Sequence, residues 1–393
     1  MPSSNQFREI LTDTLAAARA RDYAGFSKFD ALNSPLLSAL SLNNKWLRLI
    51  YTQLIKQSPI NFRGLLGVKT SRNPKGIALF ARAYLLMHES SGDPEYLAEA
   101  ETLLQWLLDN PSPDQDHLCW GYNFVWQSPI FLQAKFEPNT VVTVFVGEAL
   151  LHAYKVTGKA KYLDAVVNCA AFITDDLPVL HEDENERAIP YVLRAVGAVV
   201  LNNQVLTGAL LAKVWRENKD DRLLEIAGKQ MMYTYNRRTE YDCWYYTWPR
   251  NKSPITHDNY HTGGILDAYL EYYEATGDDR FMNGYWSGLE YYRENLFEPD
   301  FAPRWMNDKQ YPYDVHGSAQ GIITFAKAAR HDGKYLETAT GISEWACSNL
   351  YRPGTSDFIY RQGRLMKWNY CLMRWCNGWM TRALAELVKA SKG

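Results

Sequence analysis

The sequence predicts an all-α protein, an (α/α)6 toroid in which six helical hairpins close into a ring. Two observations predict this fold. A short turn motif recurs at steps of 66, 60, 59 and 54 residues, and helical patterns flank each copy. We expect one domain over residues 1–393, with long loops and short β-hairpins on one face of the ring.

The composition is that of a folded protein with balanced charge. The chain carries 42 Lys and Arg against 44 Asp and Glu, and 47% of its residues are hydrophobic. Disordered chains are less hydrophobic and nucleic-acid binders carry a basic surplus, so both classes are excluded. The unusual feature is a content of 13 Trp and 26 Tyr, residues that suit stacking on sugar rings when they lie in loops.

Several sequence signals are missing. No apolar run is long enough to span a bilayer and the polar N-terminal segment has no signal-peptide core, so we expect a cytoplasmic protein. The six cysteines form no CxxC pair, which predicts free thiols and no metal site. No P-loop, GxSxG, HExxH or complete GxGxxG motif is present, and we expect no cofactor.

Each copy of the repeat is a small polar turn followed, four residues later, by Tyr, Phe or Arg. The five copies are SGDPEYL, TGKAKYL, ENKDDRL, TGDDRFM and RHDGKYL, with their turns at Gly92, Gly158, Asn218, Gly277 and His331. Glycine or asparagine at four of these turns fits the left-handed residue that ends many helices. The motif therefore predicts the tip of each hairpin.

The segments before and after the turns have different hydrophobic patterns. Residues 141–156 and 265–275, which precede turns, are apolar nearly all round and should be buried inner helices. Residues 96–108 and 162–173, which follow turns, are amphipathic and should form outer helices with one face in water. One inner helix, one outer helix and a long loop make up each unit.

The two ends of the chain complete the predicted ring. Residues 369–390 have the pattern of a sixth inner helix, and residues 7–20 can supply its outer partner. Residues 42–68 contain one more helix, WLRLIYTQLI. The alternative is an open helical solenoid, which needs terminal repeats with polar outer faces, and the sequence shows none.

The connections between hairpins are long loops rich in aromatic, amide and charged residues. They lead into the N-terminal ends of the inner helices, which share one face of a toroid, so they should build a central cleft. The predicted substrate-binding residues are Trp120, Tyr122, Asn123, Trp126, Asn139, Arg194, Asn203, Tyr246, Trp248, Arg250, Asn259, Trp305, Gln320, Lys367, Trp368, Asn369 and Arg374. The alternation of residues 241–247 also predicts a short β-strand in one loop.

Some of these polar residues have a structural alternative. Asn139 and Asp314 can be helix N-caps, and His316 can be a core histidine. Either Asp258 or Asn259 can also be a cap, although capping alone does not explain the whole HDNYH cluster. Asp followed by His recurs in HDNYH and DVH, at the start of two successive inner helices.

Two reaction classes suit these loops. Glycoside hydrolysis needs two carboxylates, for which Asp258 and Asp314 are the best-placed pair, with Asp242, Asp308 and Glu184 in reserve. Uronate lyase or epimerase chemistry instead needs acid–base groups and a cation or amide that neutralises the substrate carboxylate. The acid–base candidates are His261, His316, Tyr311 and Tyr313, and the neutralising candidates are Arg194, Arg250, Asn123 and Asn259.

The chain also resembles known proteins. The predicted toroid, over about residues 40–390, resembles the six-hairpin glycosidase superfamily. The segments CWGYNFVWQSPIF, DNYHTGGILDAYLEYYEATGD and DVHGSAQGI resemble the VpsJ-like proteins of bacterial exopolysaccharide clusters, which implies a polysaccharide context. The YH…YYEATGD stretch is similar to the helical domain of glucuronyl C5-epimerases. The HPGH-type signature of N-acylglucosamine 2-epimerases and the NNHxYW motif of alginate lyases are absent, so no catalytic residue is carried over.

The sequence therefore predicts an enzyme that acts on a glycan, with a glycoside hydrolase as the first hypothesis. A polysaccharide lyase or uronate C5-epimerase is the first alternative. A non-catalytic glycan-binding scaffold in polysaccharide biosynthesis is the second. A hydrolase should place two facing carboxylates in the cleft, whereas a lyase or epimerase should place Tyr or His opposite a cation or amide.

Overall fold

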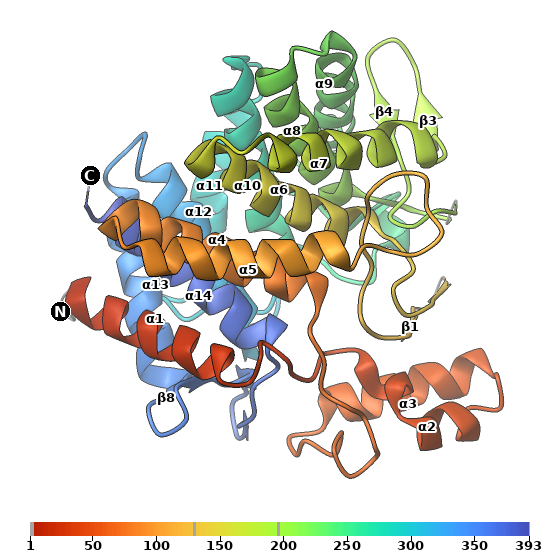
Figure 1. The fold of residues 1–393 in the computed structure, drawn as a ribbon, viewed down its shortest axis with the longest axis vertical. Coiled ribbons are helices and arrows are strands. Elements are labelled where there is room, and N and C mark those ends of the chain that lie inside the picture. The colour runs from red at the N-terminus through yellow and green to blue at the C-terminus, as the bar shows by residue number, and fades with distance from the viewer. Residues whose placement is uncertain (1–3, 129–130, 195–196, 393) are drawn as a thin grey trace.

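A closed ring of helices forms the body of the protein in the computed structural model, which describes residues 4–128, 131–194 and 197–392 (Figure 1). The inner helices are α4 (Pro74–Ser91), α6 (Thr140–Thr157), α8 (Leu201–Asn218), α10 (Asn259–Thr276), α12 (Val315–Ala328) and α14 (Trp379–Ala390). Each packs against the next, and α14 packs against α4. The predicted toroid is therefore confirmed.

An outer helix covers each inner helix. The outer helices are α1 (Ser4–Arg19), α5 (Pro94–Asp109), α7 (Ala160–Ala171), α9 (Asp221–Tyr235), α11 (Met282–Asn295) and α13 (Tyr335–Asn349). Helix α1 packs on α14, so the two ends of the chain close the ring as predicted. The inner helices are buried on nearly all sides, and every residue of α12 is buried.

Three of the predicted left-handed turns occur as expected. Gly92, Gly158 and Gly277 end α4, α6 and α10 with φ of 73°, 68° and 75°, where a side chain would be strained. The prediction for Asn218 is wrong by one position. Helix α8 includes Asn218, and Lys219 takes the left-handed conformation, with its N–H donating to the carbonyl of Trp215 at 2.7 Å.

Two predicted elements are shorter than expected. Helix α14 begins at Trp379, after a π-helical turn, η4 (Arg374–Gly378), so the predicted helix over 369–390 starts about ten residues too early. The predicted strand over 241–247 is wrong except at its end. Only Thr247–Trp248 is a strand, β6, and it pairs with β5 (Val199–Val200) from the preceding loop.

The loops carry short antiparallel strand pairs, as predicted. The pairs are β1 (Trp126–Gln127) with β2 (Leu132–Gln133), β3 (His181–Glu182) with β4 (Arg187–Ala188), and β8 (Tyr351–Arg352) with β9 (Asp357–Phe358). A three-stranded sheet joins β7 (Tyr313–Asp314), β10 (Arg361–Gln362) and β11 (Lys367–Trp368). The loops also contain the turns η2 (Phe172–Asp176) and η3 (Arg250–Lys252).

A small lobe projects beside this loop face (lower right in Figure 1). This α2–α3 lobe, residues 30–69, contains η1 (Asp30–Asn33), α2 (Pro35–Leu40) and α3 (Lys45–Gln57), and α3 matches the helix predicted in 42–68. Its own core is small and is built on Ala31, Leu37 and Ile55. In the described part of the chain, no helix is both long and apolar enough to cross a membrane.

Candidate functional site

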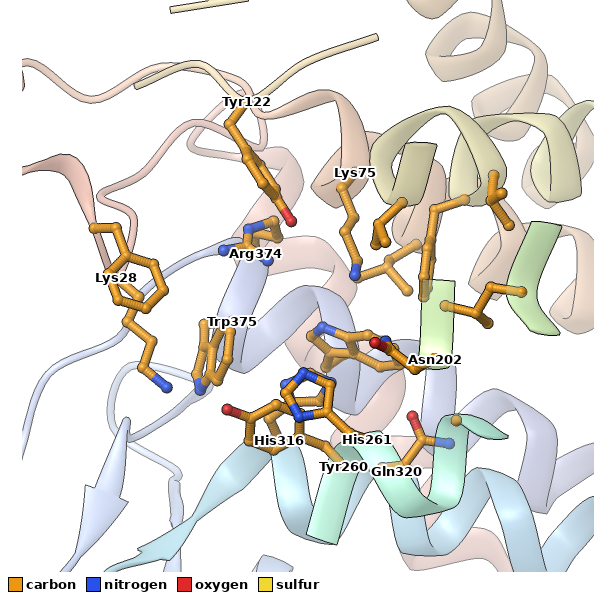
Figure 2. Close-up of a pocket in the computed structure, with 18 of the residues that line it drawn as sticks. Lys28, Lys75, Tyr122, Asn202, Tyr260, His261, His316, Gln320, Arg374 and Trp375 are labelled. Carbon is orange, nitrogen blue, oxygen red and sulfur yellow. The ribbon is translucent and has the colours of Figure 1, made fainter. Parts of the chain in front are cut away.

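The N-terminal ends of the inner helices surround a cavity of about 470 Å³ (Figure 2). Equivalent positions of the repeat face it, because the second residue of each of the first five inner helices lines the wall. These residues are Lys75, Val141, Asn202, Tyr260 and His316. The cavity therefore lies at the face of the toroid where the cleft was predicted.

Aromatic side chains form a large part of the cavity wall. The wall contains Trp126, Trp305, Trp375, Trp379, Tyr122, Tyr191, Tyr246, Tyr260, Phe29 and Phe145. Around Trp126, the ring of Phe29 lies at 5.6 Å and that of Tyr122 at 6.4 Å between centroids. Flat rings interspersed with polar groups are suited to stacking on sugar rings.

His261 and Asp258 form a hydrogen-bonded pair at the start of α10. Because they are three residues apart in the first turn, their side chains meet on one side of the helix. Nδ1 of His261 lies 2.9 Å from Oδ1 of Asp258 and 2.8 Å from Oδ2. A carboxylate at Nδ1 holds the proton there, which leaves Nε2 of the neutral imidazole as a proton acceptor. His261 lines the cavity, in contact with the rings of Tyr246 and Tyr260.

His316 is the second histidine of the cavity, and its surroundings keep it uncharged. Its ring stacks on that of Tyr260 at 4.6 Å and 10°, and contacts that of Trp379 at 4.1 Å. Burial, and then the nearby charges of Lys75 and Lys28, lower the pKa of His316 well below its usual value. Neither ring nitrogen has a hydrogen-bond partner among the described residues, so its hydrogen-bonding capacity is unused.

Two buried basic side chains face the same cavity without a carboxylate partner among the described residues. Lys75 is only 6% exposed, and its Nζ lies 3.7 Å from the ring centroid of Phe145. Arg374, on η4, is 4% exposed and lies against the rings of Tyr122 and Trp375, and its Nε has no hydrogen-bond partner in the described chain. Burial lowers the pKa of both groups, and that of Lys75 lies well below the usual value. An anionic ligand would compensate these cations.

Lys28 and Lys56 add two amines whose charge changes near neutral pH. Nζ of the buried Lys28 lies 3.6 Å from the ring centroid of Trp375 and 3.7 Å from Oδ2 of Asp314. Burial lowers the pKa of Lys28 to about 7 despite this carboxylate. For Lys56, burial and then the charge of Arg361 lower the pKa to about 8.

Eight of the predicted site residues line the cavity. They are Tyr122, Trp126, Tyr246, His261, Trp305, His316, Gln320 and Arg374. Their side chains come from loops and helix starts of several repeats, which the toroid brings together around one axis. Their roles in binding or catalysis stay predictions.

The two predicted catalytic carboxylates are buried directly behind the wall. Asp258 and Asp314 hold the same position, the N-cap, in successive inner helices, and neither lines the cavity. Asp314 caps α12 by accepting from the backbone N–H of His316 at 3.0 Å, and it also accepts from Nε1 of Trp375 at 2.7 Å. Counted from these caps, His316 is equivalent to Tyr260 and not to His261.

Five predicted substrate-binding residues are buried away from the cavity and satisfy other polar groups. Trp120, Asn203 and Asn259 each donate to a backbone carbonyl. Asn139 is the N-cap of α6, as its structural alternative predicted. Asn123 donates to the hydroxyl of Ser71 at 2.8 Å. These side chains position the loops and do not meet the cavity.

The remaining predicted residues lie elsewhere in the loops. Arg194 forms an ion pair with Glu137 at 3.0 Å, and Trp368 donates to the carbonyl of Gln57 at 2.9 Å. None of the following lines the cavity: Arg194, Trp248, Arg250, Tyr311, Tyr313, Lys367, Trp368, Asn369, Asp242, Asp308 and Glu184. A long loop has an outer side as well as an inner one, which composition alone does not distinguish.

Sequence reasoning missed several residues of the wall. They are Lys28, Lys56, Lys75, Asn202, Tyr260, Trp375 and Trp379. The second position after each N-cap is the signal that finds Lys75, Asn202 and Tyr260. Lys28 and Lys56 precede the first inner helix, where no repeat marks them.

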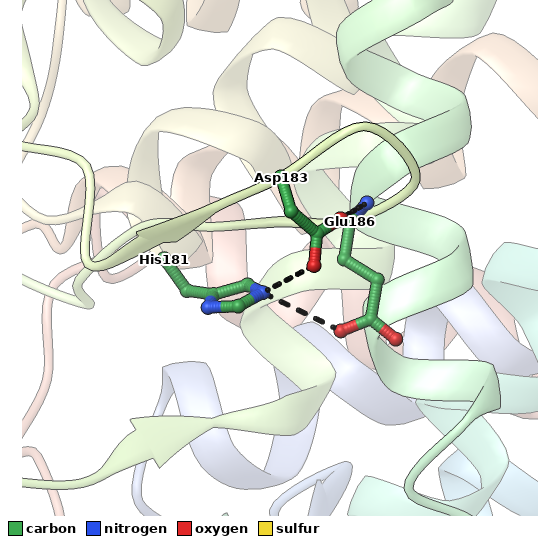
Figure 3. Close-up of side chains that lie close together, drawn as sticks. All are labelled: His181, Asp183 and Glu186. Atoms are coloured by element: carbon green, nitrogen blue, oxygen red, sulfur yellow. Dashed lines mark hydrogen bonds and ion pairs between the residues drawn. The ribbon is translucent and has the colours of Figure 1, made fainter.

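Outside the cavity, three side chains of the β3–β4 hairpin lie close enough together to hold a metal ion (Figure 3). Nε2 of His181 lies 3.2 Å from Oδ2 of Asp183 and 3.7 Å from Oε2 of Glu186. However, Glu186 already pairs with Arg237 at 2.7 Å, and Asp183 accepts two backbone N–H groups of the hairpin. These contacts explain the cluster without a metal ion, because they link the hairpin to the end of α9.

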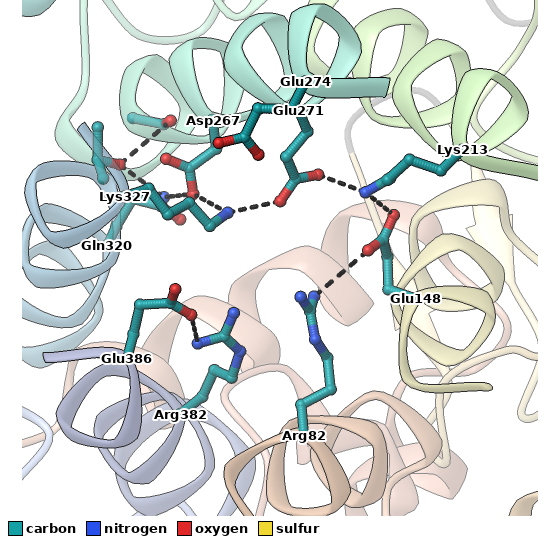
Figure 4. A network of polar contacts seen from close by, with 12 residues as sticks. Arg82, Glu148, Lys213, Asp267, Glu271, Glu274, Gln320, Lys327, Arg382 and Glu386 are labelled. Atoms are coloured by element: carbon teal, nitrogen blue, oxygen red, sulfur yellow. Dashed lines mark hydrogen bonds and ion pairs between the residues drawn. The ribbon is translucent and has the colours of Figure 1, made fainter. Parts of the chain in front are cut away.

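Further along the inner helices from the loop face, these helices contribute a ring of paired charges (Figure 4). Its bases are Arg82, Lys213, Lys327 and Arg382, and its acids are Glu148, Asp267, Glu271 and Glu386. Lys327 joins Glu271 at 2.6 Å and Asp267 at 3.1 Å, and Lys213 joins Glu271 at 2.5 Å. The four bases match the four acids here, in contrast to the unpaired cations nearer the loops.

This ring predicts a large effect of Lys327 on stability. Replacing Lys327 with Met leaves Asp267 and Glu271 buried with less compensation, so the free energy of unfolding should fall by about 3–5 kcal/mol. The matched control is Lys389→Met, whose exposed pair with Glu89 should contribute less than about 1 kcal/mol. Urea unfolding of the three proteins measures both values. Equal losses in the two variants would contradict the prediction.

The fold has clear counterparts among solved structures, although no family model and no curated protein matches the sequence. A glycoside hydrolase family 76 mannosidase of Bacteroides thetaiotaomicron aligns over 98% of this chain and 99% of its own, with a TM-score of 0.66 and 14% identity. A sugar epimerase from a ruminal bacterium aligns over 83% and 90%, at 0.66 and 13%. An unsaturated glucuronyl hydrolase specific for heparin aligns over 83% and 88%, at 0.58 and 15%. The chain therefore shares the (α/α)6 toroid fold of these structures.

Proposed function

We propose that this protein is an acid–base enzyme that acts on a uronate-containing glycan, as a lyase or a C5-epimerase. One observation carries the proposal. A histidine supported by a carboxylate and two unpaired buried cations line a single aromatic cavity (Figure 2). That combination suits removal of a proton next to a carboxylate.

The chemistry follows from the positions of these groups. Nε2 of His261 would take the C5 proton, and the C5–H electron pair would move into the substrate carboxylate as an enediolate. Lys75 and Arg374 would stabilise this negative charge. In a lyase the electron pair then returns to form the C4–C5 double bond as the C4–O bond breaks, and the proton held by His261 passes to the departing O4. In an epimerase a proton that comes from solvent is added to C5 from the opposite face, and His261 releases the proton it took to solvent.

The coarser part of the proposal, a carbohydrate substrate, has independent support. The structural neighbours are named as a mannosidase, a sugar epimerase and a glucuronyl hydrolase, all acting on sugars. The aromatic wall suits sugar rings. The resemblance to VpsJ-like proteins favours an exopolysaccharide as the polymer. That polymer and a cytoplasmic location stay predictions.

A glycoside hydrolase, the first hypothesis from the sequence, becomes the second candidate. The favouring observation is that Asp258 and Asp314 begin adjacent inner helices at the cavity, and two of the neighbours are named as hydrolases. It ranks second because both carboxylates are already hydrogen-bonded behind the wall, whereas hydrolysis needs them against the substrate.

Three measurements on one set of polysaccharides separate these functions. Purified protein is incubated with uronate-containing and matched neutral polymers. We expect either ultraviolet absorbance of an unsaturated uronate or deuterium uptake from solvent at C5, with uronate polymers only. New reducing ends without either signal would identify a hydrolase and overturn the proposal. Binding without any reaction would identify the scaffold alternative.

A further inference from the structure

Exposed apolar side chains gather on the α2–α3 lobe. Among the described residues, 9 of the 15 exposed large hydrophobic side chains lie within residues 36–65. They are Leu36, Leu40, Leu42, Trp46, Ile50, Leu54, Ile60, Phe62 and Leu65. Large apolar patches on a folded protein mark surfaces that are covered in use.

Helix α3 presents part of this surface as a regular stripe. Trp46, Ile50 and Leu54 are four residues apart and are 68%, 50% and 62% exposed. Thr52 and Ile55 on the other side are buried against the lobe. The helix is therefore amphipathic with its apolar stripe turned outward, although helices of globular proteins normally turn it inward.

The β10–β11 hairpin extends the same surface. Trp368 of this hairpin donates to the carbonyl of Gln57 at 2.9 Å, and Arg361 donates to the Gln57 side chain at 2.7 Å, so the hairpin lies against the end of α3. Its tip carries Leu365 and Met366, which are 92% and 49% exposed.

The exposed charge of the lobe has one sign. No Asp or Glu occurs from Ala31 to His88. The one acid of the lobe, Asp30, is buried in an ion pair with Arg63 at 2.6 Å. The exposed charges that remain, such as Lys45 and Lys69, are positive.

We propose that the α2–α3 lobe docks this protein onto an anionic phospholipid surface. A helix with exposed Trp and aliphatic side chains, flanked by lysines, is suited to insert between lipid headgroups. The charge argues against a second copy, because a symmetric contact would set two basic surfaces against each other. Helix α3 also supplies Gln53 and Lys56 to the cavity wall, so docking would hold the cavity beside the bilayer.

Vesicle sedimentation tests this proposal with the full chain. The probes are vesicles of phosphatidylcholine alone and vesicles with equal parts of phosphatidylglycerol. The test variant is Ile50→Asn with Leu54→Asn, and the matched control is Val179→Asn with Tyr241→Asn, which are exposed elsewhere. Because all four side chains are exposed, the variants should melt at the wild-type temperature.

We expect the wild type and the control to bind the anionic vesicles, less so in high salt, and the test variant to partition about tenfold less. Equal binding to both vesicle types would overturn the choice of an anionic surface. A dimer in light scattering that the test variant abolishes, without vesicle binding, would identify a second copy as the occupant. A monomer that binds neither vesicle would also overturn the proposal, and would leave an acidic protein as the occupant.

Discussion

Replacing His261 with Asn should lower kcat/KM by about 10²–10⁴ while leaving the fold intact, because it removes the proposed base. The side chain is partly exposed to the cavity, and Asn preserves a hydrogen bond to Asp258. Asp258→Asn should have a smaller effect, about 10–100-fold, because the amide oxygen can still accept from Nδ1 of His261 but carries no charge to fix that tautomer. The measurement is steady-state turnover of the uronate polymer that the panel identifies.

The chain offers a matched control for this pair. His117 contacts Asp176 through the same nitrogen at 2.9 Å, but it does not line the cavity. His117→Asn should therefore leave kcat/KM unchanged. Full activity of His261→Asn, with activity lost in both Asp258→Asn and Asp314→Asn, would instead identify the carboxylates as the catalytic pair and support the hydrolase.

The fold could be predicted because a repeat is a strong signal in a sequence. Each turn motif fixes the tip of a hairpin, and the hydrophobic pattern on either side distinguishes buried from half-buried helices. The predictions that failed concern the exact ends of helices. The left-handed residue is Lys219 and not Asn218, and η4 lies where the first turns of the last inner helix were expected. Both depend on local backbone hydrogen bonds that hydrophobic patterns do not report.

The site could be predicted only in part, because polar residues near helix starts have two uses. Asn139 and Asp314 both satisfy free backbone N–H groups at a helix start. Capping explains their residue type whether or not a ligand site lies nearby. His261 and Gln320 reach the cavity because they lie further along their helices. Lys75 was missed because a single lysine after Asn-Pro does not indicate a site in the sequence. Only the closed ring brings it to the same cavity as residues of the other repeats.

Replacing Lys75 with Met should weaken binding of glucuronate by about 10–100-fold and leave binding of glucose unchanged. A charge-assisted hydrogen bond contributes about 1.5–3 kcal/mol, and glucose has no carboxylate to use it. Arg374→Met should behave in the same way. Calorimetric titration with the two sugars measures this difference. An equal loss for both would mean that these cations only shape the cavity.

Lys75→Met should also make the protein more stable, although it weakens the binding of glucuronate. This pair of opposite effects is the sharper test. Lys75 is buried without a carboxylate partner, so Met should raise the free energy of unfolding at neutral pH by about 1–3 kcal/mol. Because burial lowers the folded-state pKa below the unfolded one, the wild type gains stability as pH rises toward the usual pKa of lysine, and the advantage of Met should shrink there. If Lys75 served only in packing, its replacement would instead lower the free energy of unfolding. If Lys75 serves to bind an anionic substrate, it should lower the free energy of unfolding until that substrate is bound. Urea unfolding at several pH values, with and without glucuronate, distinguishes the packing role from the binding role.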